Sequence, residues 1–206
     1  LETMRWDPVE GFALLERHLR RQAASGRYFG IPFDRVRVRP ALEEAVGGTA
    51  PLRVRLLVDE AGECSVEVAP LLPNGAAPVR VGLAEHPIDA QDPFLFHKTT
   101  RRDVYEAARA SRPDCDQVIL WNERGMVTET DIANVALLRG GRWVTPPASA
   151  GLLPGTMRAD LLERGVIAEA DVPVAELNTA SRIAVFSSVR GWQDAELVAG
   201  HLPLTR

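Results

Sequence analysis

The chain is organised around Phe94-Leu-Phe-His-Lys-Thr-Thr-Arg-Arg102, with Tyr105 just beyond it. Lysine is very rare in this sequence, whose positive charge is nearly all arginine, and Lys98 follows a short aromatic and aliphatic run. An ammonium group placed behind apolar residues loses solvation, so that its pKa falls. A neutral amine can attack a carbonyl group or hold one covalently. The alternative is an exposed lysine at the end of a strand, whose stem packs while its ammonium reaches water.

Composition excludes several classes of function. The chain has 206 residues, of which 46% are hydrophobic and 25% charged, as in soluble globular proteins of one or two small domains. The formal net charge is −4 and the arginine pairs are scattered, so nothing favours nucleic acid or an anionic membrane as partner. Cys64 and Cys115 lack metal-ligand spacing, and we expect no metal. The absence of a signal peptide pattern and of an 18-residue apolar run predicts a cytoplasmic protein.

The first ninety residues predict a helix-covered antiparallel sheet. Alternation of apolar and polar residues predicts strands over 1–6, 52–58, 64–68 and 79–83. Leu15, Leu19 and Ala23 recur at helical spacing within 12–29, and 40–46 is expected to form a second, short helix. The polar, proline-rich segment 86–93 is the best linker candidate. We therefore expect a small α+β domain over 1–88 and a larger domain over 89–206.

The second half predicts further strands and helices. Helices are expected over 101–109 and from about 152 to 164, and strands over 117–121, 142–145, 174–177 and 183–187. The segment 126–138 alternates or bends without clean periodicity.

Glu129 is the second informative residue, because it lies between Thr128 and Thr130 in an otherwise apolar segment. A carboxylate in such a place is costly unless it meets a positive or proton-bearing partner. One interpretation is an exposed glutamate on a strand. The other is a carboxylate that keeps a heteroaromatic nitrogen protonated, as pyridoxal 5′-phosphate (PLP) requires in order to act as an electron sink.

Two places in the sequence could hold a phosphate group. The first is the helix start after Pro154-Gly155-Thr156, where backbone N–H groups and the helix dipole favour an anion. The second is Ser187-Ser188, two hydroxyls at the end of a predicted strand, and Arg21 could supply the counter-charge. Each signal alone is typical of ordinary turns. Together with Lys98 and Glu129, these sites predict a lysine, a carboxylate and an anion pocket, the three groups that PLP needs.

Several motifs in order resemble the class IV aminotransferases, the fold-type IV PLP enzymes, over nearly the whole length. They are Glu2-Thr-Met-Arg5, His18-Leu-Arg-Arg21, Lys98-Thr-Thr-Arg-Arg102, Thr128-Glu-Thr130 through Asn134, Gly155-Thr-Met-Arg158 and Phe186-Ser-Ser-Val-Arg-Gly191. Within this family the chain is most similar to the 4-amino-4-deoxychorismate lyases, in particular to lyase domains fused behind an aminodeoxychorismate synthase component.

The resemblance implies a role for each matching residue. Lys98 matches the lysine that bonds covalently to the cofactor, and Glu129 matches the carboxylate that pairs with its pyridine nitrogen. Thr3 matches a catalytic threonine that distinguishes the lyases from the transaminases, in which glycine is usual. The remaining cofactor-binding positions are Arg21, Asn134, Gly155, Thr156, Ser187 and Ser188. The candidates for substrate carboxylates are Arg5, Arg102 and Arg190.

The resemblance also implies a fold, a reaction and partners. The fold would be a small two-layer α+β domain followed by a larger pseudo-barrel domain, in a homodimer. The reaction would be PLP-dependent release of pyruvate and 4-aminobenzoate, a folate precursor, by a chain fused to or working with a synthase component. Two alternatives stay open: a transaminase of branched-chain or D-amino acids with the same cofactor, and a non-catalytic dimerisation or binding module that keeps the fold.

Overall fold

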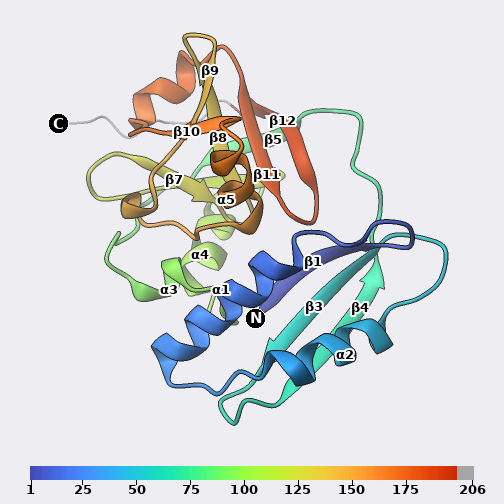
Figure 1. Ribbon diagram of the computed structural model, residues 1–206. Helices are drawn as coiled ribbons and strands as arrows, with labels where there is room; N and C mark the ends of the chain where they lie inside the picture. Colours follow the sequence, from blue (N-terminus) through green and yellow to red (C-terminus); the bar gives the residue numbers. More distant parts are fainter. Residues whose placement is uncertain (199–206) are drawn as a thin grey trace. The chain divides into compact units, whose positions relative to one another are not determined.

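The computed structural model describes residues 1–198 as two compact units (Figure 1). The first unit comprises residues 1–74 together with the short segments 98–100 and 188–190. The second comprises 75–97, 101–187 and the described residues from 191 onward. The expected boundary at 88 therefore lies within the second unit, and Lys98 groups with the first unit although its neighbours His97 and Arg101 do not.

The first unit is a four-stranded antiparallel sheet with two helices packed on one face. In chain order its elements are β1 (Glu2–Asp7), β2 (Gly11–Phe12), α1 (Leu15–Phe29), α2 (Arg35–Ala45), β3 (Leu52–Val58) and β4 (Cys64–Pro70), with strand order β2-β1-β3-β4. Its core joins Met4, Val54 and Leu56 of the sheet to Leu19 of α1 and to Val38 and Leu42 of α2. This arrangement confirms the expected two-layer α+β architecture.

Both helices of the first unit begin at residues other than those predicted. α1 begins at Leu15 rather than at Phe12, because Leu14 takes a left-handed conformation with φ of 55° and Phe12 pairs with Trp6. α2 begins at Arg35 rather than at Pro40, because the Asp34 carboxylate accepts the Val36 N–H and caps the helix.

The second unit contains an eight-stranded mixed sheet. In chain order its elements are β5 (Val79–Leu83), α3 (Pro93–Phe96), α4 (Asp103–Ser111), β6 (Gln117–Trp121), β7 (Val127–Thr130), β8 (Asn134–Arg139), β9 (Arg142–Thr145), η1 (Ala148–Ala150), α5 (Thr156–Glu163), β10 (Ile167–Glu169), η2 (Val174–Asn178), β11 (Ile183–Ser187) and β12 (Gly191–Leu197). The strand order is β10-β9-β8-β11-β12-β5-β6-β7. Strands β6, β9 and β11 have the predicted bounds.

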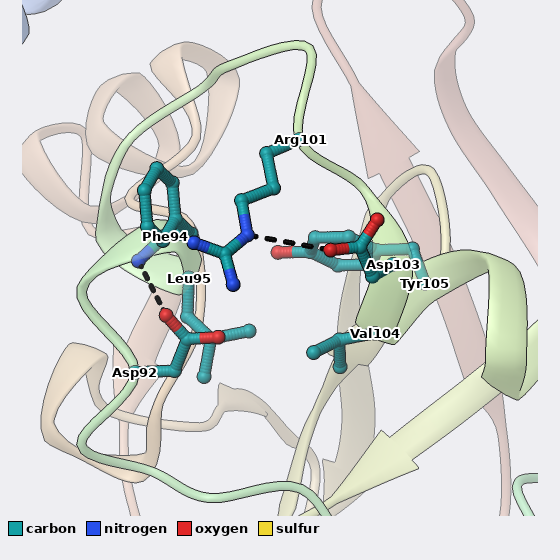
Figure 2. A pocket seen from close by; sticks show the side chains of 7 residues that line it. All are labelled: Asp92, Phe94, Leu95, Arg101, Asp103, Val104 and Tyr105. Carbon is teal, nitrogen blue, oxygen red and sulfur yellow. Dashed lines mark hydrogen bonds and ion pairs between the residues drawn. The ribbon is translucent and has the colours of Figure 1, made fainter.

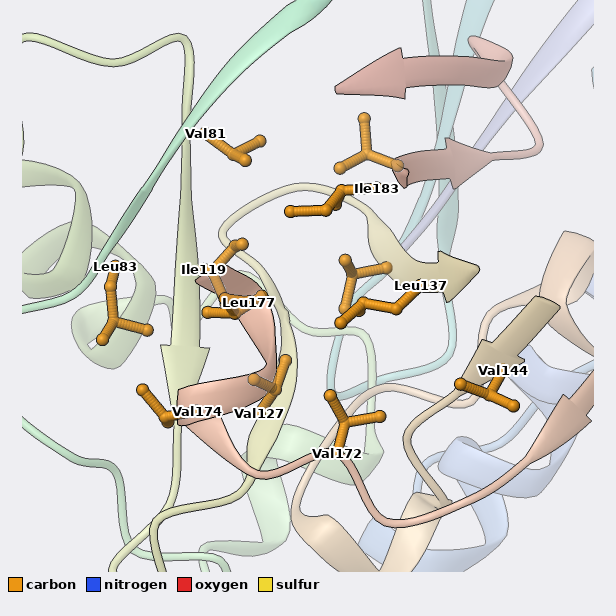
Figure 3. Packing of buried hydrophobic residues seen from close by; sticks show 12 residues of the cluster. Val81, Leu83, Ile119, Val127, Leu137, Val144, Val172, Val174, Leu177 and Ile183 are labelled. Carbon is orange, nitrogen blue, oxygen red and sulfur yellow. The ribbon is translucent and has the colours of Figure 1, made fainter. Parts of the chain in front are cut away.

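One apolar core packs against the large sheet, and Figure 3 shows its side chains meeting. Buried side chains from six strands meet there, among them Val81 of β5, Ile119 of β6, Val127 of β7 and Leu137 of β8. Val172, Val174 and Leu177, which follow β10, complete the cluster. This mixed eight-stranded sheet is the curled half-barrel of the expected fold class, which is confirmed.

Two predicted strands have other roles in the structure. Val79–Leu83 does not join the first sheet: it lies between β12 and β6, parallel to both, and belongs to the second unit. Residues 174–177 are a 3₁₀-helix rather than a strand, because Val174 and Leu177, three residues apart, both face the core. No helix within residues 1–198 has the length and apolar character of a membrane span.

Candidate active site

Glu129 is a buried carboxylate held by three hydrogen-bond donors of the second unit. Its side chain lies in β7 and is 4% exposed. Oε1 accepts the Tyr105 hydroxyl at 2.8 Å and the Leu153 N–H at 2.9 Å, while Oε2 accepts Nδ2 of Asn134 at 3.2 Å. The expectation that this carboxylate meets proton-bearing partners is confirmed.

The loop before α5 ties Glu129 to a helix start. Asn134, the first residue of β8, donates from Nδ2 to the Leu153 carbonyl at 3.0 Å as well as to Glu129. Oδ1 of Asn134 lies so close to Gly155 that a Cβ atom added to Gly155 would be 2.0 Å from this oxygen. Gly155 is the N-cap of α5, whose first residue, Thr156, is buried. The N–H groups and dipole of this first turn favour an anion, only two residues beyond the Leu153 N–H that binds Glu129.

Tyr105 is a wall of a small pocket in the second unit (Figure 2). The lining residues are Asp92, Phe94, Leu95, Arg101, Asp103, Val104 and Tyr105, around an open space of about 320 Å³ that includes solvent. Figure 2 shows the Arg101 guanidinium reaching in over the Phe94 ring, 4.3 Å from its centroid, and pairing with Asp103. The ring of Tyr105 therefore faces this pocket while its hydroxyl binds Glu129.

A second buried cluster lies in the first unit, where Glu2 of β1 meets His18 and Arg21 of α1. Arg21 pairs with Glu2 through Nε at 2.9 Å and Nη2 at 2.6 Å, and His18 Nδ1 lies 2.6 Å from Oε2 of Glu2. Burial alone would raise the pKa of Glu2, but Arg21 and His18 outweigh it and hold the pKa at about 2. Burial lowers the pKa of His18 despite Glu2, so that its neutral ring donates the Nδ1–H at neutral pH.

Lys98 belongs to the first unit and lies within electrostatic reach of this cluster. Burial is the largest cause of the lowered pKa of His18. The positive charges of Arg21 and Lys98 lower this pKa further, whereas Glu2 raises it. Lys98 is also the only lysine in the 206-residue sequence. Any chemistry that needs a side-chain amine must therefore use this residue.

Thr3 lies on the other face of β1, the face without helices. In the strand register Thr3 pairs with Arg55, and the neighbouring Arg5 pairs with Arg53, so that three arginines flank Thr3 on that face. Arg5 pairs with Asp7 at 3.0 Å and Arg55 with Glu67 at 2.7 Å. Arg5 is a predicted substrate-binding residue, whereas Arg53 and Arg55 were not predicted, because their placement beside Thr3 depends on strand register.

The other candidate arginines have local partners. Arg102 donates to the backbone carbonyl of Asp131, and its guanidinium lies 4.6 Å from the centroid of the Tyr105 ring. Arg190 donates to the Leu72 carbonyl at 2.6 Å. Substrate binding by Arg5, Arg102 and Arg190 stays a prediction, as do cofactor contacts of Arg21, Ser187 and Ser188.

The donor set of the second unit fits PLP. A buried carboxylate suits a ligand whose ring nitrogen carries a proton, and the helix start one short loop away suits its phosphate group. The sole lysine satisfies the remaining chemical requirement, an amine that can bond to the aldehyde. Among residues 1–198 no group of His, Cys, Asp and Glu could hold a metal ion.

Comparison with known sequences shows the family. The amino-transferase class IV family matches residues 1–198, and the chain belongs to it. This is a family of PLP-dependent enzymes, so the expected family and cofactor are confirmed at that level.

Individual relatives carry two kinds of name. A Schizosaccharomyces pombe protein named "Putative aminodeoxychorismate lyase" is 35% identical over 186 residues, 86% of this chain and 80% of that protein. The structure of a Mesorhizobium loti protein named "Putative amino-acid aminotransferase" is 36% identical with a TM-score of 0.91, and the match covers 96% of this chain and 98% of that one. The 4-amino-4-deoxychorismate lyase of Pseudomonas aeruginosa is 26% identical with a TM-score of 0.74, covering 98% of this chain and 83% of that one.

Proposed function

We propose that this chain is a PLP-dependent lyase that converts 4-amino-4-deoxychorismate to 4-aminobenzoate and pyruvate. The observation that carries the proposal is the buried Glu129, which accepts hydrogen bonds from Tyr105, Asn134 and Leu153, beside a helix start that suits a phosphate group. The names of the S. pombe and P. aeruginosa relatives favour the lyase, as does Thr3, which the resemblance associates with lyases.

Each proposed cofactor contact uses a property of one residue. Glu129 would accept the N–H of the pyridine ring, and Lys98 would supply the amine that bonds to the aldehyde. The first turn of α5 at Thr156, with Ser187, Ser188 and Arg21, would bind the phosphate group. PLP, when bound, supplies an electron sink for negative charge at the carbon that bears the substrate's amine.

The protein's own residues would then move one proton and hold two carboxylates. The Nζ atom of Lys98 would take the proton from the amine-bearing carbon as general base. Thr3 Oγ1 would donate a hydrogen bond to the departing enolpyruvyl oxygen. The released enolpyruvate gains a proton at its methylene carbon to become pyruvate, and the remaining ring is 4-aminobenzoate, so all atoms of the substrate are accounted for.

The arginines that flank Thr3 suit the two carboxylates of this substrate. Within residues 1–198 Arg53 forms no ion pair, so an anion binding there would not have to displace an acidic side chain. Arg55 and Arg5 would have to exchange Glu67 and Asp7 for the substrate. These surface pairs are worth little, so the exchange costs little. A homodimer and an aminodeoxychorismate synthase partner stay predictions.

A class IV aminotransferase of amino acids is the second candidate, and the M. loti relative favours it. The two candidates share Lys98, Glu129 and the phosphate contacts but form different products.

The test is incubation of the purified protein with PLP and 4-amino-4-deoxychorismate, with Lys98→Ala as control. The lyase releases 4-aminobenzoate and pyruvate in equal amounts, without any keto acid as co-substrate. Amino-group exchange with 2-oxoglutarate and no release of 4-aminobenzoate would establish the aminotransferase instead.

A further inference from the structure

Tyr105 and Leu153 together occupy one oxygen of Glu129. The Tyr105 hydroxyl and the Leu153 N–H both donate to Oε1, at 2.8 and 2.9 Å, whereas Oε2 receives the longer 3.2 Å bond from Asn134. Hydrogen bonds to a carboxylate stabilise its charged form and lower its affinity for a proton. The two hydrogen bonds at Oε1 therefore lower the basicity of the Glu129 carboxylate.

The Tyr105 hydroxyl is a permanent donor. Burial raises the pKa of Tyr105, and the Glu129 carboxylate raises it further, as does Asp92 to a smaller extent, while Arg102 opposes them. The phenol consequently stays protonated at any working pH. Its hydrogen bond can run only from Tyr105 to Glu129.

The ring of Tyr105 is fixed from two sides. The Arg102 guanidinium lies 4.6 Å from the ring centroid and is itself held by the Asp131 carbonyl. Tyr105 lies in the first turn of α4, two residues after Asp103, and packs against an apolar cluster that includes Val118 and Leu120 of β6. A side chain held in this way can fix the direction in which a carboxylate points.

We propose that Tyr105 is a positioning residue, which orients Glu129 and weakens its basicity so that a shared proton stays on the ring nitrogen of PLP rather than on the carboxylate. This inference rests on the proposed function, because it requires PLP to bind to Glu129. A more basic Glu129 would draw the proton away from the ring. The ring would then withdraw less electron density from the reacting carbon.

The test is the Tyr105→Phe variant, which removes only the hydroxyl. Its kcat is expected to fall about tenfold while KM changes less than about twofold, at the lower end of the value of a hydrogen bond to a charged group. The pH midpoint of the visible absorbance band of bound PLP is expected to rise by about half a unit. Tyr28→Phe is the matched control, since Tyr28 is 60% exposed and is the other tyrosine of the chain. Tyr28→Phe should match the wild type in kcat, in KM and in the pH midpoint of the absorbance band.

A double-mutant cycle with Glu129→Gln tests the route of the effect. When the Glu129→Gln substitution is already present, Tyr105→Phe should change neither the absorbance midpoint nor kcat further, because the hydroxyl acts through the carboxylate. Equal effects of Tyr105→Phe with and without Glu129→Gln would overturn the proposal.

A graded variant covers the case in which Tyr105→Phe does not fold. In the Tyr28→Phe background, 3-fluorotyrosine enters the chain only at position 105, where its more acidic hydroxyl is a stronger donor. The absorbance midpoint is then expected to move down instead of up. A wild-type protein that binds PLP and releases 4-aminobenzoate, with midpoints unmoved by either change, would refute the role of Tyr105 alone. A wild type without cofactor band or product would refute the proposed function.

Discussion

Replacement of Glu2 by glutamine should destabilise the first unit by an amount that depends on pH. Glu2 is 1% exposed and ion-paired with Arg21, and its pKa is about 2 against an ordinary 4.5. At 1.36 kcal/mol per pKa unit, this difference makes the charged carboxylate worth about 3 kcal/mol of folding free energy at pH 7. Glu2→Gln removes that charge and leaves Arg21 with a neutral partner.

The pH dependence follows from the direction of the shift. A carboxyl group whose pKa is lowered on folding stabilises the protein above its unfolded pKa, and the contribution disappears as pH falls toward the folded value. The difference between wild type and Glu2→Gln should therefore be full at pH 7, about 1 kcal/mol smaller at pH 4, and about 2 kcal/mol smaller at pH 3.

Urea unfolding of the PLP-free proteins, followed by circular dichroism, measures these differences. Glu16→Gln is the control, because its ion pairs with Arg35 and Arg39 are at the surface, and it should leave the free energy of unfolding nearly unchanged. A Glu2→Gln protein as stable as the wild type at pH 7, or a difference that stays constant down to pH 3, would refute the reasoning.

Two further predictions concern the cofactor loop and the arginine face. Gly155→Ala should cost about 1–3 kcal/mol of stability and weaken PLP binding, because the new methyl group would overlap Oδ1 of Asn134. Thermal unfolding and PLP titration measure the two effects. Gly75→Ala is the control, since Gly75 has open space around it. Arg53→Ala should raise KM for 4-amino-4-deoxychorismate about tenfold with little change in kcat. Arg37→Ala is the control and should leave KM unchanged, because Arg37 is a surface residue paired with Glu63. If steady-state kinetics of Arg53→Ala show an unchanged KM, Arg53 does not bind the substrate.

The fold was predictable where local pattern determines it. Strands β6, β9 and β11 have the predicted bounds because each is a continuous or alternating apolar run bounded by turns. The sheet that contains Val79–Leu83 was not predictable, because parallel pairing with β12 requires contact with residues more than a hundred positions away. The 3₁₀-helix that begins at Val174 was predicted as a strand, because the pattern of four mostly apolar residues is the same for both structures.

The site was predictable in its unusual residues and not in their partners. Glu129 stood out because a carboxylate in an apolar segment demands compensation. Asn134 lay in the same motif, but two other donors, Tyr105 and the backbone of Leu153, are each 24 residues away, and a backbone N–H carries no sequence signal. Glu2, His18 and Arg21 lie inside the quoted motifs, but only the structure shows that the Glu2 carboxylate binds both His18 and Arg21.

The most direct test of the account is a mass measurement on the PLP-loaded protein after borohydride reduction. Because the chain has a single lysine, one cofactor-derived mass is expected, on the peptide that contains Lys98, and none in Lys98→Ala. An unmodified Lys98 in a protein that nevertheless releases 4-aminobenzoate, or a label confined to the amino terminus, would contradict the assignment.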